Sequence, residues 1–296
     1  MNRQEEIREL NRLSVEELVE RAEGHLILVD DLDQLHRHFS ASILSVIRSN
    51  NETSGNTTLI LPYGPTGQYP LFKDTVNRDR ISLASTRIFF MDEYADSSGR
   101  ALPPSHPLSF RGQIAWLWEE INPELRPVPS NIVFPHEGNA DRLEDLIKAA
   151  GGIDVCYGGV GIHGHLAFNE PAQGVRESGP RLVTLNDYTV TMNAIRSQVG
   201  GDLENFPRAA WTLGMRQCLE ARQICLYCRN DVPNLDWANT VLRLALLGQP
   251  GDDYPVTWIR SHEHWQIVAK PMGSRNGIRL DELTWARIAL VQDEEA

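Results

Sequence analysis

Residues 153–171 read IDVCYGGVGIHGHLAFNEP, and this stretch decides the fold class. Its first five residues are mostly apolar, which is typical of a short strand buried on both faces of a sheet. The glycines that follow predict a loop whose backbone can approach a ligand closely. In open α/β sheets, ligands bind beyond the carboxyl ends of the strands. We therefore expect a buried strand over residues 153–157 and a functional loop directly after it.

Runs of the same kind recur along the chain and alternate with helical patterns. The predicted strands are residues 57–61, 86–91, 131–134, 153–157, 181–185 and 224–227. The helical patterns between them are residues 71–76, 108–120, 140–150, 190–199 and 235–247. Apolar strands that alternate with helices indicate a parallel sheet covered on both faces. The fold class expected is α/β, a Rossmann-like parallel sheet flanked by helices on both faces.

The first part of the chain has a different pattern. Ser14 followed by Glu17 is a capping-box signature, and residues 33–48 carry apolar side chains at helical spacing. We expect residues 1–56 to form a helical N-terminal extension packed on an α/β domain of residues 57–296. The two parts would then make one structural domain.

Composition excludes several classes of protein. The 296 residues include 28 Lys and Arg against 40 Asp and Glu, a net charge of -12, which lacks the basic footprint of a nucleic-acid-binding protein. No apolar run approaches the roughly 20 residues of a membrane span, and the N-terminus does not read as a signal peptide. We expect a cytoplasmic protein with no nucleic-acid or membrane partner. The four cysteines, which are few and lie in apolar segments, are expected to be buried and structural.

Three predicted strands end in residues that can do chemistry. Residues 64–70 form a Gly/Pro-rich turn before a helix, where backbone N–H groups can hold a phosphate. Asp92 and Glu93 offer carboxylates for proton transfer, and His163 and His165 are acid/base groups at neutral pH, with Glu170 available to orient one of them. If the sheet is parallel, these three loops meet in one cleft.

These residues also form motifs of a known family. FMDEY at residues 90–94 and GGVGIHGHLAFNEP at residues 158–171 resemble the two most diagnostic motifs of the glucosamine-6-phosphate deaminase family. HPLSF at residues 106–110 matches the segment that follows the first motif, and Pro255, Thr257 and His262 match a motif near the C-terminus. The neighbouring 6-phosphogluconolactonases share the Gly-His part but typically lack the Phe-Asn-Glu-Pro ending. The resemblance spans residues 57–270 in consistent order.

The resemblance implies aldose-to-ketose isomerisation of an amino-sugar phosphate with loss of ammonia, without a redox cofactor or a metal. His165 would open the sugar ring with Glu170 orienting it, and Asp92 would take the proton from C2. His163 stands where the family usually has the acid that assists ring opening. Homo-oligomers are common in the family. The substrate-binding residues implied are Gly64, Thr66, Gly67, Gln68, Glu93, Gly159, Gly161, Asn169, Arg196 and Arg229.

Several departures from the family pattern indicate a divergent member. His163 replaces a carboxylate, and Gln68 and Tyr69 replace a small residue and a hydroxyl residue of the phosphate loop. Arg229 stands near the place of the family's phosphate-binding lysine, and Arg196 lies one residue from the register of its arginine. Two alternatives stay open: a sugar-lactone hydrolase in which His165 activates water, and a non-catalytic sugar-phosphate-binding protein.

Overall fold

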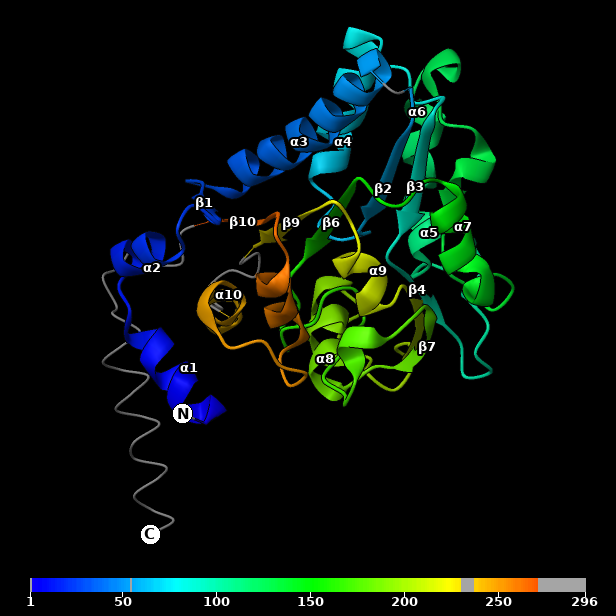
Figure 1. Ribbon diagram of the computed structural model, residues 1–296. Coiled ribbons are helices and arrows are strands. Elements are labelled where there is room, and N and C mark those ends of the chain that lie inside the picture. The colour runs from blue at the N-terminus through cyan, green and yellow to red at the C-terminus, as the bar shows by residue number, and fades with distance from the viewer. Residues whose placement is uncertain (1, 54, 230–236, 271–296) are drawn as a thin grey trace.

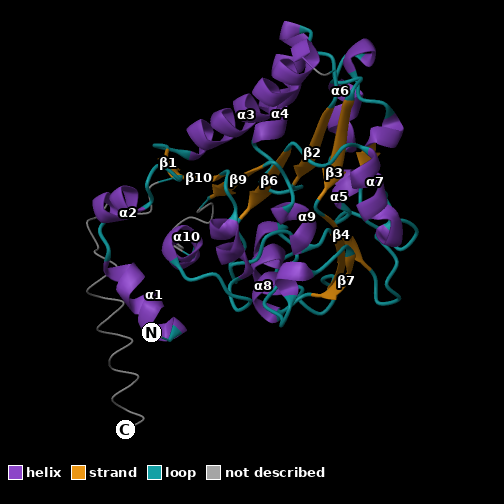
Figure 2. Ribbon diagram, in the orientation of Figure 1, coloured by secondary structure: helices purple, strands orange, loops and turns teal. Residues whose placement is uncertain are grey.

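The computed structural model describes residues 2–53, 55–229 and 237–270 (Figure 1). Within these residues the chain forms a seven-stranded sheet and a three-stranded sheet. Helices lie on both sides of the larger sheet (Figure 2).

The seven-stranded sheet is parallel throughout, as expected. Its spatial order is β1, β10, β9, β6, β2, β3, β5, and every neighbouring pair runs in the same direction. The strands are β1 (Leu26–Leu28), β2 (Thr57–Leu61), β3 (Thr86–Phe90), β5 (Ile132–Val133), β6 (Val155–Gly159), β9 (Gln223–Cys228) and β10 (Trp265–Ala269). The chain runs from β2 through β3 to β5 and then returns to β6 on the other side of β2. The order therefore reverses between β2 and β6, where a ligand crevice is expected.

Side chains of the sheet alternate between two hydrophobic cores. Leu59 and Leu61 of β2 lie in the core that also contains Phe39, whereas Ile60 lies in the other core with Ile147. This period of two follows from the pleat of the strand. The first core is covered by α3 (Leu32–Thr53), α4 (Gln68–Asp79), α5 (Phe110–Gln113), α6 (Ala115–Glu120) and α8 (Asp187–Arg196). The second is covered by α2 (Val15–Arg21), α7 (Leu143–Ala149), α9 (Met215–Leu219) and α10 (Asn239–Leu247).

All four cysteines are buried and free. Cys225 belongs to one core and Cys228 to the other, because residues three apart on a strand point to opposite faces.

The second sheet corrects one expectation. Residues 181–185 were predicted to join the parallel sheet, but β7 (Arg181–Thr184) pairs antiparallel with β8 (Ala209–Thr212), which pairs antiparallel with β4 (Asp92–Ala95). The physical reason lies in burial: β7 alternates between half-buried and exposed residues, and Leu182 is 41% exposed. A strand of the parallel sheet would be buried on both faces.

The N-terminal segment contributes a strand as well as helices. α1 (Arg3–Arg12), α2 and α3 are helical as expected, and capping boxes open the first two. Between α2 and α3, however, β1 pairs with β10 at the edge of the main sheet. Residues 271–296, assigned to the main domain from the sequence, and residues 235–236 of the predicted helix 235–247 lie outside the described residues.

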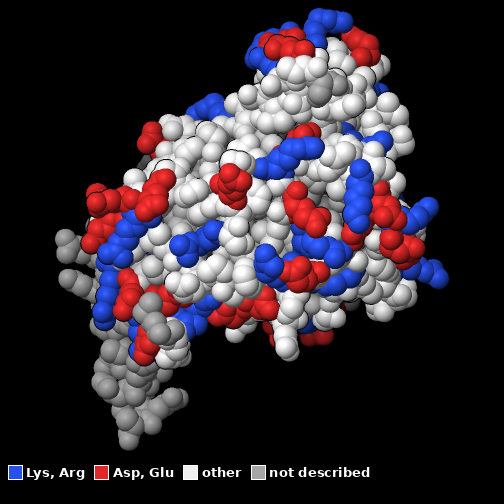
Figure 3. Space-filling model, viewed as in Figure 1, with Lys and Arg blue, Asp and Glu red and all other residues white. Residues whose placement is uncertain are grey.

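Two surface properties bear on function. None of the helices in the described part of the chain is both long and apolar enough to cross a membrane. On the face seen in Figure 3, basic and acidic side chains are intermixed, so that face carries no basic stripe for a nucleic-acid backbone.

Candidate active site

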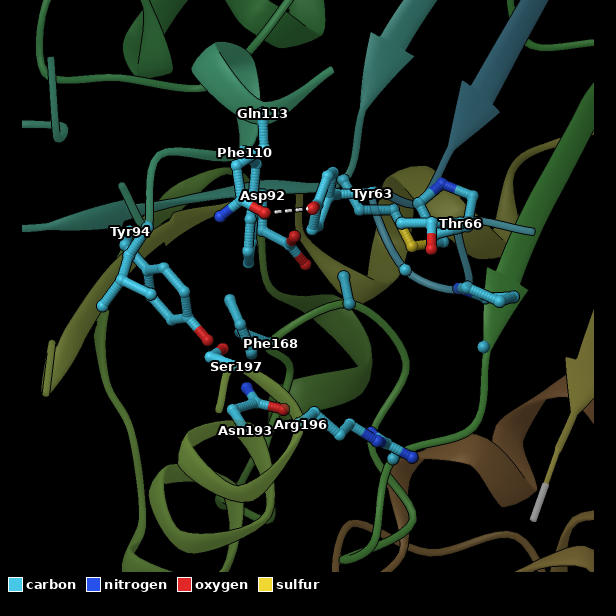
Figure 4. A pocket seen from close by; sticks show the side chains of 18 of the residues that line it. Tyr63, Thr66, Asp92, Tyr94, Phe110, Gln113, Phe168, Asn193, Arg196 and Ser197 are labelled. Carbon is cyan, nitrogen blue, oxygen red and sulfur yellow. Dashed lines mark hydrogen bonds between the residues drawn. The ribbon is translucent and has the colours of Figure 1, made fainter. Parts of the chain in front are cut away.

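A cavity of about 570 Å³ opens at the point where the strand order reverses. It is lined by the segments that follow β2, β3 and β6, by residues 106–113, and by the C-terminal half of α8. In Figure 4, Asp92, Tyr63 and Gln113 lie on one wall. Asn193 and Arg196 of α8 and Ser197, which follows the helix, lie on the opposite wall. The three loops singled out in the sequence therefore meet in one cavity.

The structure brings some of the predicted site residues to this cavity and not others. Those that line it are Gly64, Thr66, Asp92, Gly159, Gly161, His165, Arg196 and Arg229. Those that are not among its lining residues are Gly67, Gln68, Glu93, His163, Asn169 and Glu170.

Asp92 is the buried acid of the cavity wall. It is the first residue of β4, where the chain leaves the parallel sheet after Met91, and it is 9% exposed. Burial, followed by the neighbouring charge of Glu93, raises the pKa of Asp92 to about 8. A carboxyl group that titrates near neutral pH can both take and return a proton.

Glu93 is an anchor inside the wall. Its carboxylate accepts hydrogen bonds from the backbone N–H groups of Phe110 (2.9 Å) and Arg111 (2.8 Å) and from the hydroxyl of Ser109 (3.0 Å). Ser109 caps α5, so Glu93 holds the segment that supplies His106 and Gln113 to the cavity. This explains why an acidic residue next to Asp92 does not face the cavity.

His165 is a buried, neutral imidazole. Burial, with smaller contributions from His163 and Arg196, lowers the pKa of His165 to about 3. A Cβ added at Gly161 would lie 1.9 Å from Nε2 of His165. Only glycine at position 161 leaves room for the ring of His165 in this position.

His163 and Glu170 lie behind His165, around the start of α8. Nδ1 of His163 is 3.1 Å from Nδ2 of Asn186, and the ring contacts those of Tyr188 and Tyr254 edge-on. Burial lowers the pKa of His163 and raises that of Glu170. Oε2 of Glu170 accepts a 2.6 Å hydrogen bond from the backbone N–H of Asn186.

Two side chains that follow β2 form hydrogen bonds with the backbone of the same loop. The hydroxyl of Tyr69 donates to the carbonyl of Pro62, and Nε2 of Gln68 donates to the carbonyl of Pro65. Both side chains are buried, and Gly67 packs so tightly on His36 that a Cβ would lie 2.3 Å from its ring. The two residues that depart from the family's loop therefore support the loop from behind and leave Gly64 and Thr66 on the cavity side.

Asn169 secures the loop that carries His165. Its Nδ2 donates to the carbonyls of Leu166 and Leu213, both at 3.0 Å, and its Oδ1 accepts from Arg181 at 2.9 Å. Asn169 is fully buried, so its contribution is to loop geometry.

Two arginines line the cavity. Arg196 and Arg229 both line it, and the guanidinium of Arg196 lies 4.7 Å from the centre of the Trp237 ring. Arginine is suited to phosphate recognition because its donors form a planar fork.

Two polar residues at the C-terminal end of α8, Asn193 and Ser197, were not predicted from the sequence. Asn193 and Ser197 line the cavity beside Arg196, and the side chain of Asn193 contacts the Tyr94 hydroxyl. The spacing of Thr189, Asn193 and Arg196 places them on one side of a helix, and this spacing could have identified Asn193 as a neighbour of Arg196 from the sequence. Within the described residues, no group of three or more His, Cys, Asp or Glu side chains could hold a metal ion.

The chain is similar in sequence to several known proteins. No protein-family model matches the chain. Glucosamine-6-phosphate deaminase of Caenorhabditis elegans is 31% identical over 209 residues, covering 68% of this chain and 74% of the relative. Glucosamine-6-phosphate deaminase 2 of Bacillus subtilis is 29% identical over 234 residues, covering 76% of this chain and 88% of the relative. Glucosamine-6-phosphate deaminase 1 of Bos taurus is 31% identical over 210 residues, covering 68% and 69%.

Solved structures share the fold. A monomeric glucosamine-6-phosphate deaminase, described as a missing link of the NagB superfamily, superposes with a TM-score of 0.71 at 21% identity, covering 83% of this chain and 96% of that one. The 6-phosphogluconolactonase of Thermotoga maritima gives a TM-score of 0.58 at 15% identity, covering 83% and 98%. At these identities the likeness establishes the architecture of the parallel sheet and its helices.

Proposed function

Because the chain belongs to the glucosamine-6-phosphate deaminase family, we propose that it converts an amino-sugar phosphate to a ketose phosphate and ammonia in the cavity at the switch point. The observation that carries this proposal is the placement of Asp92 and His165 on the wall of one cavity that also contains two arginines.

Ring opening is the first step. The proton of the anomeric hydroxyl must leave and a proton must reach the ring oxygen, so that the C1–O bond to the ring breaks. His165 is neutral and can accept the first proton and return it to the ring oxygen. Glu170 would orient the imidazole of His165 for this step.

Isomerisation and loss of ammonia follow. The Asp92 carboxylate takes the proton from C2 of the open-chain aldose while O1 gains a proton from solvent, giving an enolamine. The resulting Asp92 acid protonates C1, giving a C2 iminium. Water adds to C2, ammonia leaves and one proton returns to solvent, so that one amino-sugar phosphate and one water give one ketose phosphate and one ammonia. A pKa of about 8 suits a group that works as both base and acid.

The phosphate would lie beside the arginines of the cavity. Arg196 and Arg229 line it, as do Gly64 and Thr66 of the loop after β2. Gln68 and Tyr69 are buried and bonded to the backbone of this loop, so neither side chain lines the cavity, which supports a phosphorylated substrate.

The test is Asp92→Asn, which keeps the shape of the side chain and removes the base. In D₂O, exchange of the C2 proton of glucosamine 6-phosphate should fall by about 10²–10⁴-fold, the usual contribution of a general base. The circular dichroism spectrum should match that of the wild type. Exchange at the wild-type rate in folded Asp92→Asn would remove Asp92 from the mechanism.

A further inference from the structure

The tight turn that carries His165 is held by residues that do not line the cavity. Within the turn, the backbone N–H of Gly164 donates to the carbonyl of Gly161 at 2.9 Å, and the N–H of Gly161 donates to the carbonyl of His165 at 3.0 Å. From outside the turn, the backbone N–H of Val256 donates to the carbonyl of Gly164 at 2.7 Å. The ring of Tyr254 packs on the same glycine, since a Cβ added at Gly164 would lie 2.6 Å from Cδ1 of that ring. Val256 and Tyr254 therefore hold the turn in place.

The segment of residues 249–257, which supplies both contacts, is closed around a buried hydroxyl. Oγ1 of Thr257 donates to the carbonyl of Tyr254 at 2.7 Å and accepts from the backbone N–H of Gly251 at 2.9 Å. Thr257 is fully buried, so water does not compete for these bonds. Thr257 belongs to the motif near the C-terminus, and the closed segment gives that motif a place in the structure, because it presents Tyr254 to the turn of His165.

Arg3, in the first turn of α1, binds this segment with a fork of hydrogen bonds. Its Nε and Nη2 donate to the two carboxylate oxygens of Asp253 at 2.7 and 2.8 Å, and Nη2 also donates to the carbonyl of Gln249 at 2.9 Å. The guanidinium lies 5.7 Å from the centre of the Tyr254 ring. A two-point pair between arginine and carboxylate fixes orientation as well as distance. Arg3 therefore fastens the segment that holds the active-site turn.

The same end of α1 makes two further contacts with this segment. Oε1 of Glu6 accepts from the backbone N–H of Gln249 at 2.6 Å, and the other carboxylate oxygen pairs with Arg3. Glu6 is 6% exposed, so this bond is also shielded from water. Ile7 and Tyr254 pack against one apolar cluster, which contains Leu10, Leu13 and Leu244. Polar and apolar contacts of α1 therefore meet at the segment beside the active-site turn.

We propose that Arg3 is a positioning residue for His165, and that it acts through Asp253 and Tyr254 on the turn at Gly164. The catalytic part of this inference rests on the proposed function. Gly164 directly precedes His165, and displacement of a reacting group by about 1 Å can cost about 10²-fold in rate. Arg3 does not line the cavity, whereas the two arginines proposed to bind phosphate do. Loss of Arg3 should therefore lower kcat and leave KM near its wild-type value.

The kinetics of ammonia release test this coupling. Arg3→Met, which keeps an apolar stem and removes the charge, should lower kcat by about 10- to 10²-fold with KM unchanged. Asp253→Ala should do the same, and the double variant should lose no more than the worse single variant, because both changes break one contact. Arg78→Met, which removes an exposed ion pair on α4, is the control and should keep the wild-type kcat.

All variants would be assayed well below their unfolding transitions, so a loss of global stability alone leaves kcat unchanged. Losses that multiply in the double variant would overturn the proposal, because they would show that Arg3 and Asp253 act independently. A wild-type kcat in Arg3→Met would overturn it as well.

The position of Tyr254 can also be read without turnover, from the ring resonances of His163. The two rings meet edge-on with their centroids 5.8 Å apart, so the ring current of the tyrosine shifts the histidine protons. In NMR spectra of protein labelled at histidine, with His163 assigned through His163→Gln, Arg3→Met should move these resonances. Arg78→Met should leave them in place.

Gly251→Ala is a second way to break the same contact, and it leaves α1 unaltered. The added Cβ would lie 2.7 Å from Oδ1 of Asp253 and 2.8 Å from Nη2 of Arg3, so the pair must separate. The variant should reproduce the loss of kcat and the shifted His163 resonances of Arg3→Met. Wild-type resonances in both variants would overturn the proposal. Because these spectra need no substrate, they test the contact separately from the proposed function.

Discussion

At the scale of single residues, ionisation of Asp92 should set the pH dependence of catalysis. Burial and the charge of Glu93 disfavour its carboxylate, so the group is mostly protonated below its pKa of about 8. The base form is needed for proton abstraction, and kcat/KM should therefore rise with pH and level off above about 8. A profile that is flat between pH 6 and 9 would contradict this assignment.

The same pKa has a consequence for stability. An unfolded Asp titrates near 3.9, so between about pH 4 and 8 the folded state holds the proton more tightly and stability falls as pH rises. Asp92→Asn has no carboxyl group to ionise, so this loss of stability with rising pH does not occur in the variant. In urea denaturation the variant should gain stability over the wild type between pH 5 and 9.

Gly161 tests the geometry around His165. Gly161→Ala places a methyl group 1.9 Å from Nε2, so the imidazole must move and kcat should fall by about 10²-fold or more. Gly159→Ala is the matched comparison, because its Cβ would meet its nearest neighbour at an ordinary 3.5 Å and should cost much less. Similar losses in both variants would mean that the loop tolerates no side chain anywhere.

The two central residues of the site could be predicted from their motifs, whereas their supporting residues could not. Asp92 and His165 each follow a strand whose end meets the cavity, and strand ends can be read from apolar runs. Asn186 contacts His163 and Thr189 contacts His165, and α8 follows β7, which pairs with the second sheet and not with the main one. That contact is tertiary, and no local pattern encodes it.

At the scale of elements, Glu93 should determine the stability of the segment of residues 106–113. Both of its oxygens accept from N–H groups, so Glu93→Gln would turn an NH₂ group toward a donor and leave buried groups unpaired. We expect a loss of about 1–3 kcal/mol in the free energy of unfolding. Since the segment also lines the cavity, KM should rise.

Glu137→Gln is the control for this change, measured in the same urea titration. Glu137 also accepts from a backbone N–H, that of Ala101 at 3.0 Å, but at an exposed site where water replaces the bond. Its effect should stay within about 0.5 kcal/mol. Equal losses at both positions would contradict the anchoring role of Glu93.

The strands that could be predicted are those buried on both faces, such as β2, β3, β6 and β9. The sequence patterns missed β10 although it is also largely buried, and they missed β1, β8 and β4 for other reasons. β1 has only three residues, and β8 reads AAWT, in which two side chains are small. β4 begins with two acidic residues, which are not typical of a buried strand. Each is defined by pairing with a distant segment, which composition within a short window does not specify.

At the scale of the whole molecule, the N-terminal helix is fastened to the domain by a buried arginine. Arg243 of α10 is 4% exposed and donates from Nη1 to the carbonyls of Leu10 and Leu13, both at 2.7 Å, at the C-terminal end of α1. A cation there also complements the helix dipole. Arg3 of α1 in turn pairs with Asp253 at 2.7 Å, beside Tyr254, which contacts His163.

Arg243→Met should therefore loosen α1. The buried carbonyls would lose their charged donor, and we expect a loss of about 2–4 kcal/mol in the free energy of unfolding, measured by urea denaturation. Arg78→Met, which removes a surface ion pair with a 68% exposed arginine side chain, should cost less than about 1 kcal/mol. If the Arg243 variant were as stable as the wild type, α1 would not depend on this contact.

Deamination of a phosphorylated amino sugar in this cavity can be measured as release of ammonia together with formation of ketose phosphate. Wild type and Asp92→Asn would be assayed on glucosamine 6-phosphate, galactosamine 6-phosphate and their unphosphorylated parents. We expect equimolar ammonia and ketose phosphate from a phosphorylated sugar with the wild type, and a rate lower by about 10²–10⁴-fold with the variant. No release from any of the four sugars by folded wild-type protein would contradict it.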